Sequence, residues 1–120
     1  MNRRRVVVTG LGIISCVGNE LETAWGNVVA GRSGIGPIIE FDCSQFSTRF
    51  GGSVHDFDAD RYIPPKEQRK IDTFIQYGIA AAQDAAEHAG LSTETYPAER
   101  IGVAIGSGIG GIGTIEANYE

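Results

Sequence analysis

The chain has 120 residues, a length that suits one domain, and its 42% hydrophobic and 21% charged residues are typical of a folded globular protein. Its formal net charge of −5 argues against general nucleic-acid binding, because neutralising phosphates requires a basic surface. The two cysteines, Cys16 and Cys43, form neither a disulfide framework nor a metal-binding pattern. We therefore expect a reduced, cytoplasmic protein that binds no metal.

Residues 4–14 are predicted to form a buried strand. Val6, Val7 and Val8 make a continuous β-branched run, as in a central parallel strand that is covered on both faces. A short signal peptide is the alternative for this basic and then apolar start, but Gly10 interrupts the run and the small-residue cleavage pattern is missing. No stretch reaches the ~18 apolar residues that a membrane helix needs, so we expect no membrane span.

Residues 20–29 are predicted to form a helix with one apolar face. Asn19 is expected to cap its N-terminus, and Gly31 is expected to end it. The irregular stretch after this helix is expected to hold three short elements: strands near residues 38–41 and 50–54 and one helical turn near residues 58–62.

Residues 66–89 are predicted to form the longest helix, because apolar and small side chains recur through them at helical spacing. Gly90 is suited to cap the C-terminus of this helix. Residues 100–105 are predicted to form a second central strand. A glycine-rich loop follows at 106–113, and residues 114–120 begin a further helical element.

This order of elements predicts an α/β fold with a mostly parallel sheet. Only two central parallel strands are expected, whereas a doubly wound sheet normally has more. We therefore expect residues 1–120 to be a truncated part of one larger domain.

The glycine-rich loop has two interpretations. Gly106, Gly108 and Gly111 match the dinucleotide-binding pattern, and they follow a predicted strand as that pattern requires. The same pattern fits again from Gly108 through Gly110 to Gly113, so a glycine-rich run produces it easily. The alternative is a loop whose backbone passes close to another chain or to a bound acyl group.

Neither cysteine has the surroundings of a catalytic nucleophile. A reactive thiol needs a helix N-terminus or a basic partner that lowers its pKa. Cys16 has no histidine close in sequence, and Cys43 adjoins Asp42, whose charge would disfavour a thiolate. We expect both to be unreactive.

Lys66, Arg69 and Lys70 form a small basic cluster at the start of the longest predicted helix. At spacings i, i+3 and i+4 their side chains would project together. Cations cost some stability in the first turn of a helix, where the dipole is positive. The cluster is either a solvated charged face or a docking surface for an acidic partner or a phosphate-bearing group.

Several motifs in fixed order resemble those of the β-ketoacyl-[acyl-carrier-protein] synthases, and among them the elongating type II synthase of bacterial fatty acid synthesis. The motifs that carry this resemblance are Arg4-Arg-Val-Val-Val-Thr-Gly-Leu-Gly12, Val17-Gly-Asn19, Gly31-x-Ser-Gly34, Lys66-Glu-Gln-Arg-Lys70, Phe74-Ile-Gln-Tyr-Gly78 and Ile105-Gly-Ser-Gly-Ile-Gly-Gly111. The resemblance covers the whole chain. Cys16 stands where members of the family usually have proline, and we expect this to change the rigidity of a turn without changing activity.

The resemblance implies a thiolase-like αβαβα fold, a homodimer and covalent catalysis without a cofactor. In that family a cysteine takes the acyl chain as a thioester, and two histidines assist the decarboxylative Claisen condensation with malonyl-ACP. Family members are several times longer than this chain, and Cys16, Cys43, His55 and His88 match none of their catalytic positions. No catalytic residue is therefore assigned here, and the chain alone is expected to be inactive.

The resemblance does assign binding residues. Lys66, Arg69 and Lys70 match the cations that dock the acidic acyl carrier protein, which delivers phosphopantetheine-linked acyl and malonyl groups. Ile109 matches a residue lining the acyl pocket, and Gly108 and Gly110 supply the loop backbone beside it. The alternatives are a nucleotide-binding oxidoreductase fragment and a non-catalytic module that uses the basic cluster for another acidic partner.

Overall fold

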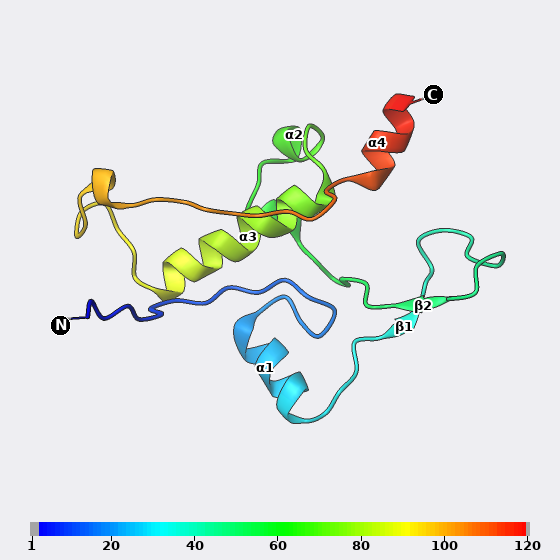
Figure 1. Ribbon diagram of the computed structural model, residues 1–120, viewed down its shortest axis with the longest axis horizontal. Helices are drawn as coiled ribbons and strands as arrows, with labels where there is room; N and C mark the ends of the chain where they lie inside the picture. The colour runs from blue at the N-terminus through cyan, green and yellow to red at the C-terminus, as the bar shows by residue number, and fades with distance from the viewer. Residues whose placement is uncertain (1–2, 120) are drawn as a thin grey trace. The chain divides into compact units, whose positions relative to one another are not determined.

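The computed structural model describes residues 3–119 (Figure 1). The chain divides into two compact units. One unit spans Ile13–Asp58. The other joins the N-terminal stretch up to Gly12 with the chain from Ala59 onward. Both candidate sites lie in this second unit.

The first unit is built around helix α1, Leu21–Val29, whose Ala24 is only 3% exposed. The predicted helix is confirmed, but its predicted N-terminal cap is wrong. Glu20 occupies the cap position, while the Asn19 side-chain amide donates a hydrogen bond to the His55 carbonyl oxygen at 2.6 Å. Asn19 therefore fastens a distant loop of the same unit and leaves the helix start without a side-chain cap.

A two-stranded antiparallel sheet follows in the same unit. β1 (Gly36–Pro37) pairs with β2 (Phe50–Gly51), with Gly36 opposite Gly51 and Pro37 opposite Phe50. The second predicted strand overlaps β2, whereas the first was predicted to start at residue 38, directly after β1 ends. Within residues 3–119 this is the whole sheet, so the predicted mostly parallel sheet is not formed there.

The second unit starts its helical part with η1 (Ala59–Arg61), in agreement with the predicted turn. The single helix predicted for residues 66–89 is wrong, because the structure divides it into α2 (Pro65–Gln68) and α3 (Thr73–His88). The break lies at Asp72, whose ψ of 154° is extended. Proline before α2 and an aspartate before α3 are both ordinary helix-start residues, so each helix begins at its own signal.

The C-terminus of α3 is as predicted. Gly90 has a positive φ of 61°, and the Leu91 amide donates to the Ala86 carbonyl at 2.9 Å. This is the Schellman arrangement that glycine favours at a helix end.

The extended N-terminal segment runs directly against α3. A Cβ atom at Gly12 would overlap the Ala81 carbonyl oxygen, and one at Gly10 would lie 2.7 Å from the Ala89 Cβ. Ala80, on the same helix, is completely buried. Glycine on the segment and alanine on the helix are therefore what allow the two backbones to approach.

The two predicted central strands are not strands in the described chain. Residues 4–14 and 100–105 are mostly extended, but Val7 is 67% exposed and Val103 is 83% exposed. A strand is defined by ladder bonds to a neighbour, and no neighbouring strand lies beside either segment within residues 3–119. The β-branched sequence pattern is present, but no neighbouring strand among the described residues pairs with either segment.

The glycine-rich segment leads into helix α4, Ile112–Tyr119, so the expected helical start near residue 114 is confirmed. Among the described residues, no helix is both long and apolar enough to cross a membrane.

Candidate functional site

A short basic segment, defined here as residues 66–70, occupies α2 and the turn after it. The Glu67 and Gln68 amides both donate to the Pro64 carbonyl, and the Lys70 amide donates to the Glu67 carbonyl at 2.9 Å. The helical path therefore continues to Lys70 and ends before α3. Lys66, Arg69 and Lys70 are all exposed.

This placement corrects the electrostatic expectation for the three cations. The sequence suggested cations at the positive end of the longest helix, where they would cost stability. The structure puts Lys66 in a helix of four residues, which has almost no macrodipole, and puts Arg69 and Lys70 in the turn after it. Asp72 stands directly before α3. The long helix thus has the acidic residue that its N-terminus favours, and the basic segment carries no such penalty.

The three cations differ in their partners. The Lys70 ammonium lies 2.7 Å from the Glu67 carboxylate, and these side chains are 57% and 52% exposed. Among the described residues, Lys66 and Arg69 have no ion-pair partner. Two of the three cations are therefore open to an incoming anion.

Two glutamines hold the basic segment in place. The Gln68 amide donates to the Asp60 carboxylate at 2.8 Å and to the Ile63 carbonyl at 2.7 Å. From α3, the Gln76 amide donates to the Gln68 carbonyl at 3.2 Å and the Ile71 carbonyl at 3.3 Å. Because Ile63 is 5% exposed, the segment is fastened to a buried point on one side and to α3 on the other.

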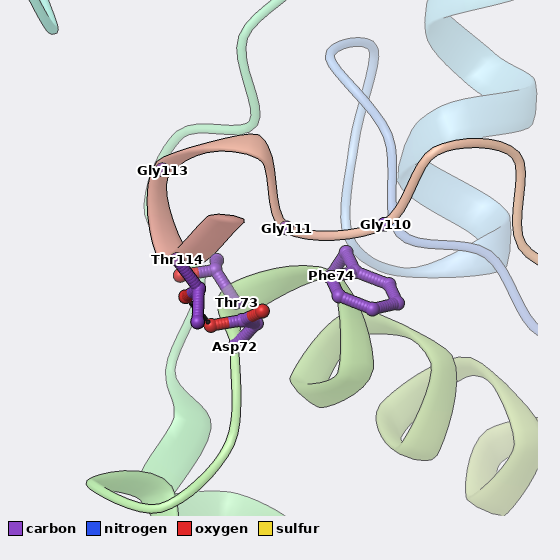
Figure 2. Close-up of a pocket in the computed structure, with 7 residues that line it drawn as sticks. All are labelled: Asp72, Thr73, Phe74, Gly110, Gly111, Gly113 and Thr114. Carbon is purple, nitrogen blue, oxygen red and sulfur yellow. Dashed lines mark hydrogen bonds between the residues drawn. The ribbon is translucent and has the colours of Figure 1, made fainter. Parts of the chain in front are cut away.

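A pocket of about 400 Å³ lies where the start of α3 meets the glycine-rich loop (Figure 2). Seven residues line it: Asp72, Thr73, Phe74, Gly110, Gly111, Gly113 and Thr114. Figure 2 shows the Phe74 ring directed toward the loop backbone at Gly110. A Cβ atom at Gly110 would lie 3.2 Å from that ring, and its φ of 80° is one that other residues rarely adopt. Glycine at this position therefore lets the loop backbone pass close to the tip of the Phe74 ring.

Asp72 connects the loop to α3. Its carboxylate accepts a hydrogen bond from the Thr114 hydroxyl, and the two side chains lie together in Figure 2. A Cβ atom at Gly111 would overlap the same carboxylate. Gly111 must stay a glycine so that Asp72 and Thr114 can meet.

The residues predicted for the acyl pocket are only partly brought together. Gly110 lines the pocket, whereas Gly108 and Ile109 are not among its lining residues, and Ile109 is 75% exposed. Ile109 directly precedes Gly110, so it lies at the edge of this pocket along the chain.

Sequence reasoning missed Asp72, Phe74 and Thr114. For Asp72 a signal existed, since aspartate before a helical pattern marks an N-terminus, but the helix was predicted to start at residue 66, seven residues before Thr73. Phe74 and Thr114 lie 40 residues apart, and no spacing rule predicts that they line one pocket.

Two other residues that were considered for catalysis, His88 and Cys16, are instead held by contacts within the fold. The His88 Nδ1 atom accepts a hydrogen bond from the Leu11 amide at 3.0 Å. The Cys16 sulfur is packed so closely that a Cβ atom at Gly52 would lie 2.9 Å from it. Residues 3–119 contain no group of three or more His, Cys, Asp or Glu side chains that could hold a metal ion.

Comparison with known proteins identifies the family. Residues 3–120 match the family described as beta-ketoacyl synthase, N-terminal domain. The 3-oxoacyl-[acyl-carrier-protein] synthase 2 of Vibrio cholerae is 53% identical over all 120 residues, and that of Coxiella burnetii is 46% identical over the same length. The chain spans 29% of the length of each of these relatives.

A solved structure agrees with the sequence relatives. "The ishigamide ketosynthase/chain length factor" matches 77% of this chain and 23% of its own, with a TM-score of 0.66 and 38% sequence identity. These matches agree with the resemblance seen in the motifs. The chain belongs to the beta-ketoacyl synthase family and corresponds to the N-terminal portion of the 3-oxoacyl-[acyl-carrier-protein] synthase II type.

Proposed function

We propose that this chain supplies the carrier-docking surface and one wall of the acyl pocket of a type II β-ketoacyl-ACP synthase. The whole enzyme would join an acyl thioester to malonyl-ACP by decarboxylative Claisen condensation, as an acyltransferase of fatty acid biosynthesis. Its relatives are named as synthases that act on the acyl carrier protein, and they are identical to this chain at about half of its positions. A thiolase-like αβαβα fold, a homodimer and a cytoplasmic setting belong to the same proposal.

The observation that carries the docking proposal is the state of the basic segment. Lys66 and Arg69 are exposed and have no ion-pair partner, and Gln68 and Gln76 fix the backbone between and beside them. Fixed, available cations suit an acidic protein partner, because complementary charge speeds encounter and sets orientation. Docking by Lys66, Arg69 and Lys70 is therefore the proposed role of this segment.

The pocket proposal rests on the glycine-rich loop. The Phe74 ring would form the apolar wall of this pocket for a hydrocarbon chain, beside the backbone of Gly110 and Gly111, and Ile109 would limit the length of that chain from the edge. The family match favours this interpretation of the loop over dinucleotide binding. Cys16 is closely packed and the His88 Nδ1 atom accepts a hydrogen bond from the Leu11 amide, so neither is proposed as a catalytic group, and the chain alone is expected to be inactive.

Titration with acyl carrier protein tests the docking proposal. The triple variant Lys66→Glu/Arg69→Glu/Lys70→Glu should weaken binding by about tenfold or more, because three positive charges of the segment become negative. The matched control reverses three other exposed and contiguous cations, Arg3, Arg4 and Arg5, and so changes the net charge equally. Equal binding by the two triple variants would refute docking at the basic segment.

A further inference from the structure

Glu67 is the one acidic residue inside the basic segment. Its carboxylate lies 2.7 Å from the Lys70 ammonium, while Lys66 and Arg69 have no ion-pair partner among the described residues. The segment therefore presents a net charge of +2 to its surroundings, from three cations and one anion. An acidic partner meets two available cations and a third that already has a carboxylate beside it.

The pairing changes what Lys70 can contribute. When an acidic partner approaches, Lys70 either keeps Glu67 or exchanges it for a carboxylate of the partner, so its net gain is small. Glu67 itself repels the partner, and at physiological salt a charge within the ~8 Å Debye length is only partly screened. Because both side chains are about half exposed, the pair is weak enough to be exchanged but strong enough to reduce binding.

Hydrogen bonds of Gln68 fix the orientation of the basic segment, on the side opposite to the Glu67–Lys70 pair. Gln68, the next residue, donates to Asp60 and to the carbonyl of buried Ile63. The helical turn that holds Gln68 inward thereby keeps Glu67 and Lys70 on the exposed side. The pair cannot leave the surface by rotation of α2 without loss of these bonds.

We propose that Glu67 is a specificity residue of the docking segment, which withholds Lys70 so that Lys66 and Arg69 carry the binding of the acidic carrier. This inference rests on the proposed docking function. The best partner is an acidic protein surface with two carboxylates placed for Lys66 and Arg69. A partner with more negative charge gains little from the third cation, and binding stays weak enough for rapid release.

Charge removal at Glu67 is the first test. The Glu67→Gln variant of the full 120-residue chain should bind acyl carrier protein about 2- to 4-fold more tightly at low salt, and the gain should shrink as salt is raised. Glu94→Gln is the matched control, because it removes the same charge from an exposed loop position of the same unit. An equal effect of the two variants would overturn the inference.

A double-mutant cycle with Lys70 is the second test. Glu67→Gln/Lys70→Met removes both charges of the pair and should change carrier binding by less than about 1.5-fold relative to the wild type, whereas Lys70→Met in the Glu67→Gln background should weaken it by about 3-fold or more. Lys66→Met should weaken binding by about 3-fold or more in both backgrounds. A loss in the double variant equal to that of Lys66→Met in the wild type would overturn the inference.

The outcomes separate this inference from the function on which it rests. If Lys66→Glu/Arg69→Glu binds the carrier as the wild type does, the docking function itself is wrong. If that variant loses binding while Glu67→Gln matches Glu94→Gln, docking stands and the role of Glu67 is wrong. Glu67→Ala, which retains helix propensity, must also bind the carrier more tightly than the wild type. If it does not, a local rearrangement accounts for the tighter binding of Glu67→Gln, and the role of Glu67 is wrong.

Discussion

The Thr114 hydroxyl donates a hydrogen bond to the Asp72 carboxylate, and this bond joins the first half of α4 to the residue directly before α3. The two residues are 42 positions apart in the sequence, and Thr114 directly follows the glycine-rich loop. Asp72 also follows the basic segment by two residues. One side chain therefore connects the end of the basic segment with the end of the glycine-rich loop.

Loss of this hydrogen bond should loosen the glycine-rich loop. Thr114→Val is nearly isosteric but cannot donate, so we expect a local loss of about 1 kcal/mol. Amide hydrogen exchange should accelerate about fivefold over residues 109–114. Thr114→Ser keeps the hydroxyl and is the matched control. Unchanged exchange in Thr114→Val would show that the bond does not hold the loop.

The packing of the N-terminal segment on α3 gives a second prediction. A methyl group at Gly12 would meet the Ala81 carbonyl, so Gly12→Ala should lower the free energy of unfolding by about 1–3 kcal/mol. Gly102→Ala is the control, because a Cβ atom there would meet nothing within 4 Å, and its effect should stay within about 0.5 kcal/mol. Urea denaturation measures both. Equal stabilities would mean that the segment does not pack on the helix.

Gln76 should influence carrier binding without carrying charge. Gln76→Met removes the two hydrogen bonds to the Gln68 and Ile71 carbonyls, which should cost about 1–2 kcal/mol locally and free the basic segment. We expect faster hydrogen exchange over residues 66–71 and weaker binding of acyl carrier protein. Gln83→Met, at an exposed position of the same helix, is the control and should change neither. If Gln76→Met binds the carrier as the wild type does, the hydrogen bonds of Gln76 are not needed for docking.

The first unit contains a pH-sensitive contact at Glu40. Hydrogen bonding from Ser53 lowers the pKa of the Glu40 carboxyl below its ordinary value of 4.5, with further contributions from backbone amides and His55. Because the folded pKa is the lower one, the stabilisation is complete above pH 4.5. It is lost as the pH falls from there through the folded pKa.

NMR titration of the Glu40 side chain checks this contact. Ser53→Ala should raise the Glu40 pKa toward 4.5, because the largest cause of the shift is removed. Ser47→Ala, in the loop before β2, is the control and should leave the Glu40 pKa unchanged. A Glu40 pKa at or above 4.5 in the wild type would contradict the assignment.

Local signals in the sequence predicted local structure well. Leucine and valine spacing gave α1, and Gly31 and Gly90 marked both helix ends, because a C-terminal cap depends only on neighbouring residues. The division into α2 and α3 was also present as Pro65 and Asp72. It was overlooked because the apolar period of α3 extends backwards through Ile71.

Contacts between distant residues could not be predicted. Val6, Val7 and Val8 have the pattern of a central strand, but a strand also requires a neighbour, and the pattern does not say where that neighbour lies. The pairing of Asp72 with Thr114 and the contact of Phe74 with Gly110 follow from the path of the glycine-rich loop. The ion pair between Glu67 and Lys70 is a local contact, and the i, i+3 spacing of the two residues is enough to predict it.

The unpaired extended segments have a consequence for handling the chain. Val7 and Val103 lie in segments whose backbone groups have no ladder partner among residues 3–119, and such edges accept strands from other molecules. Self-association at high concentration is the expected result. Arg3, Arg4 and Arg5 stand directly before the valine run, where their mutual repulsion opposes stacking of like copies. We therefore expect these arginines to act as gatekeepers that reduce aggregation through the exposed edge.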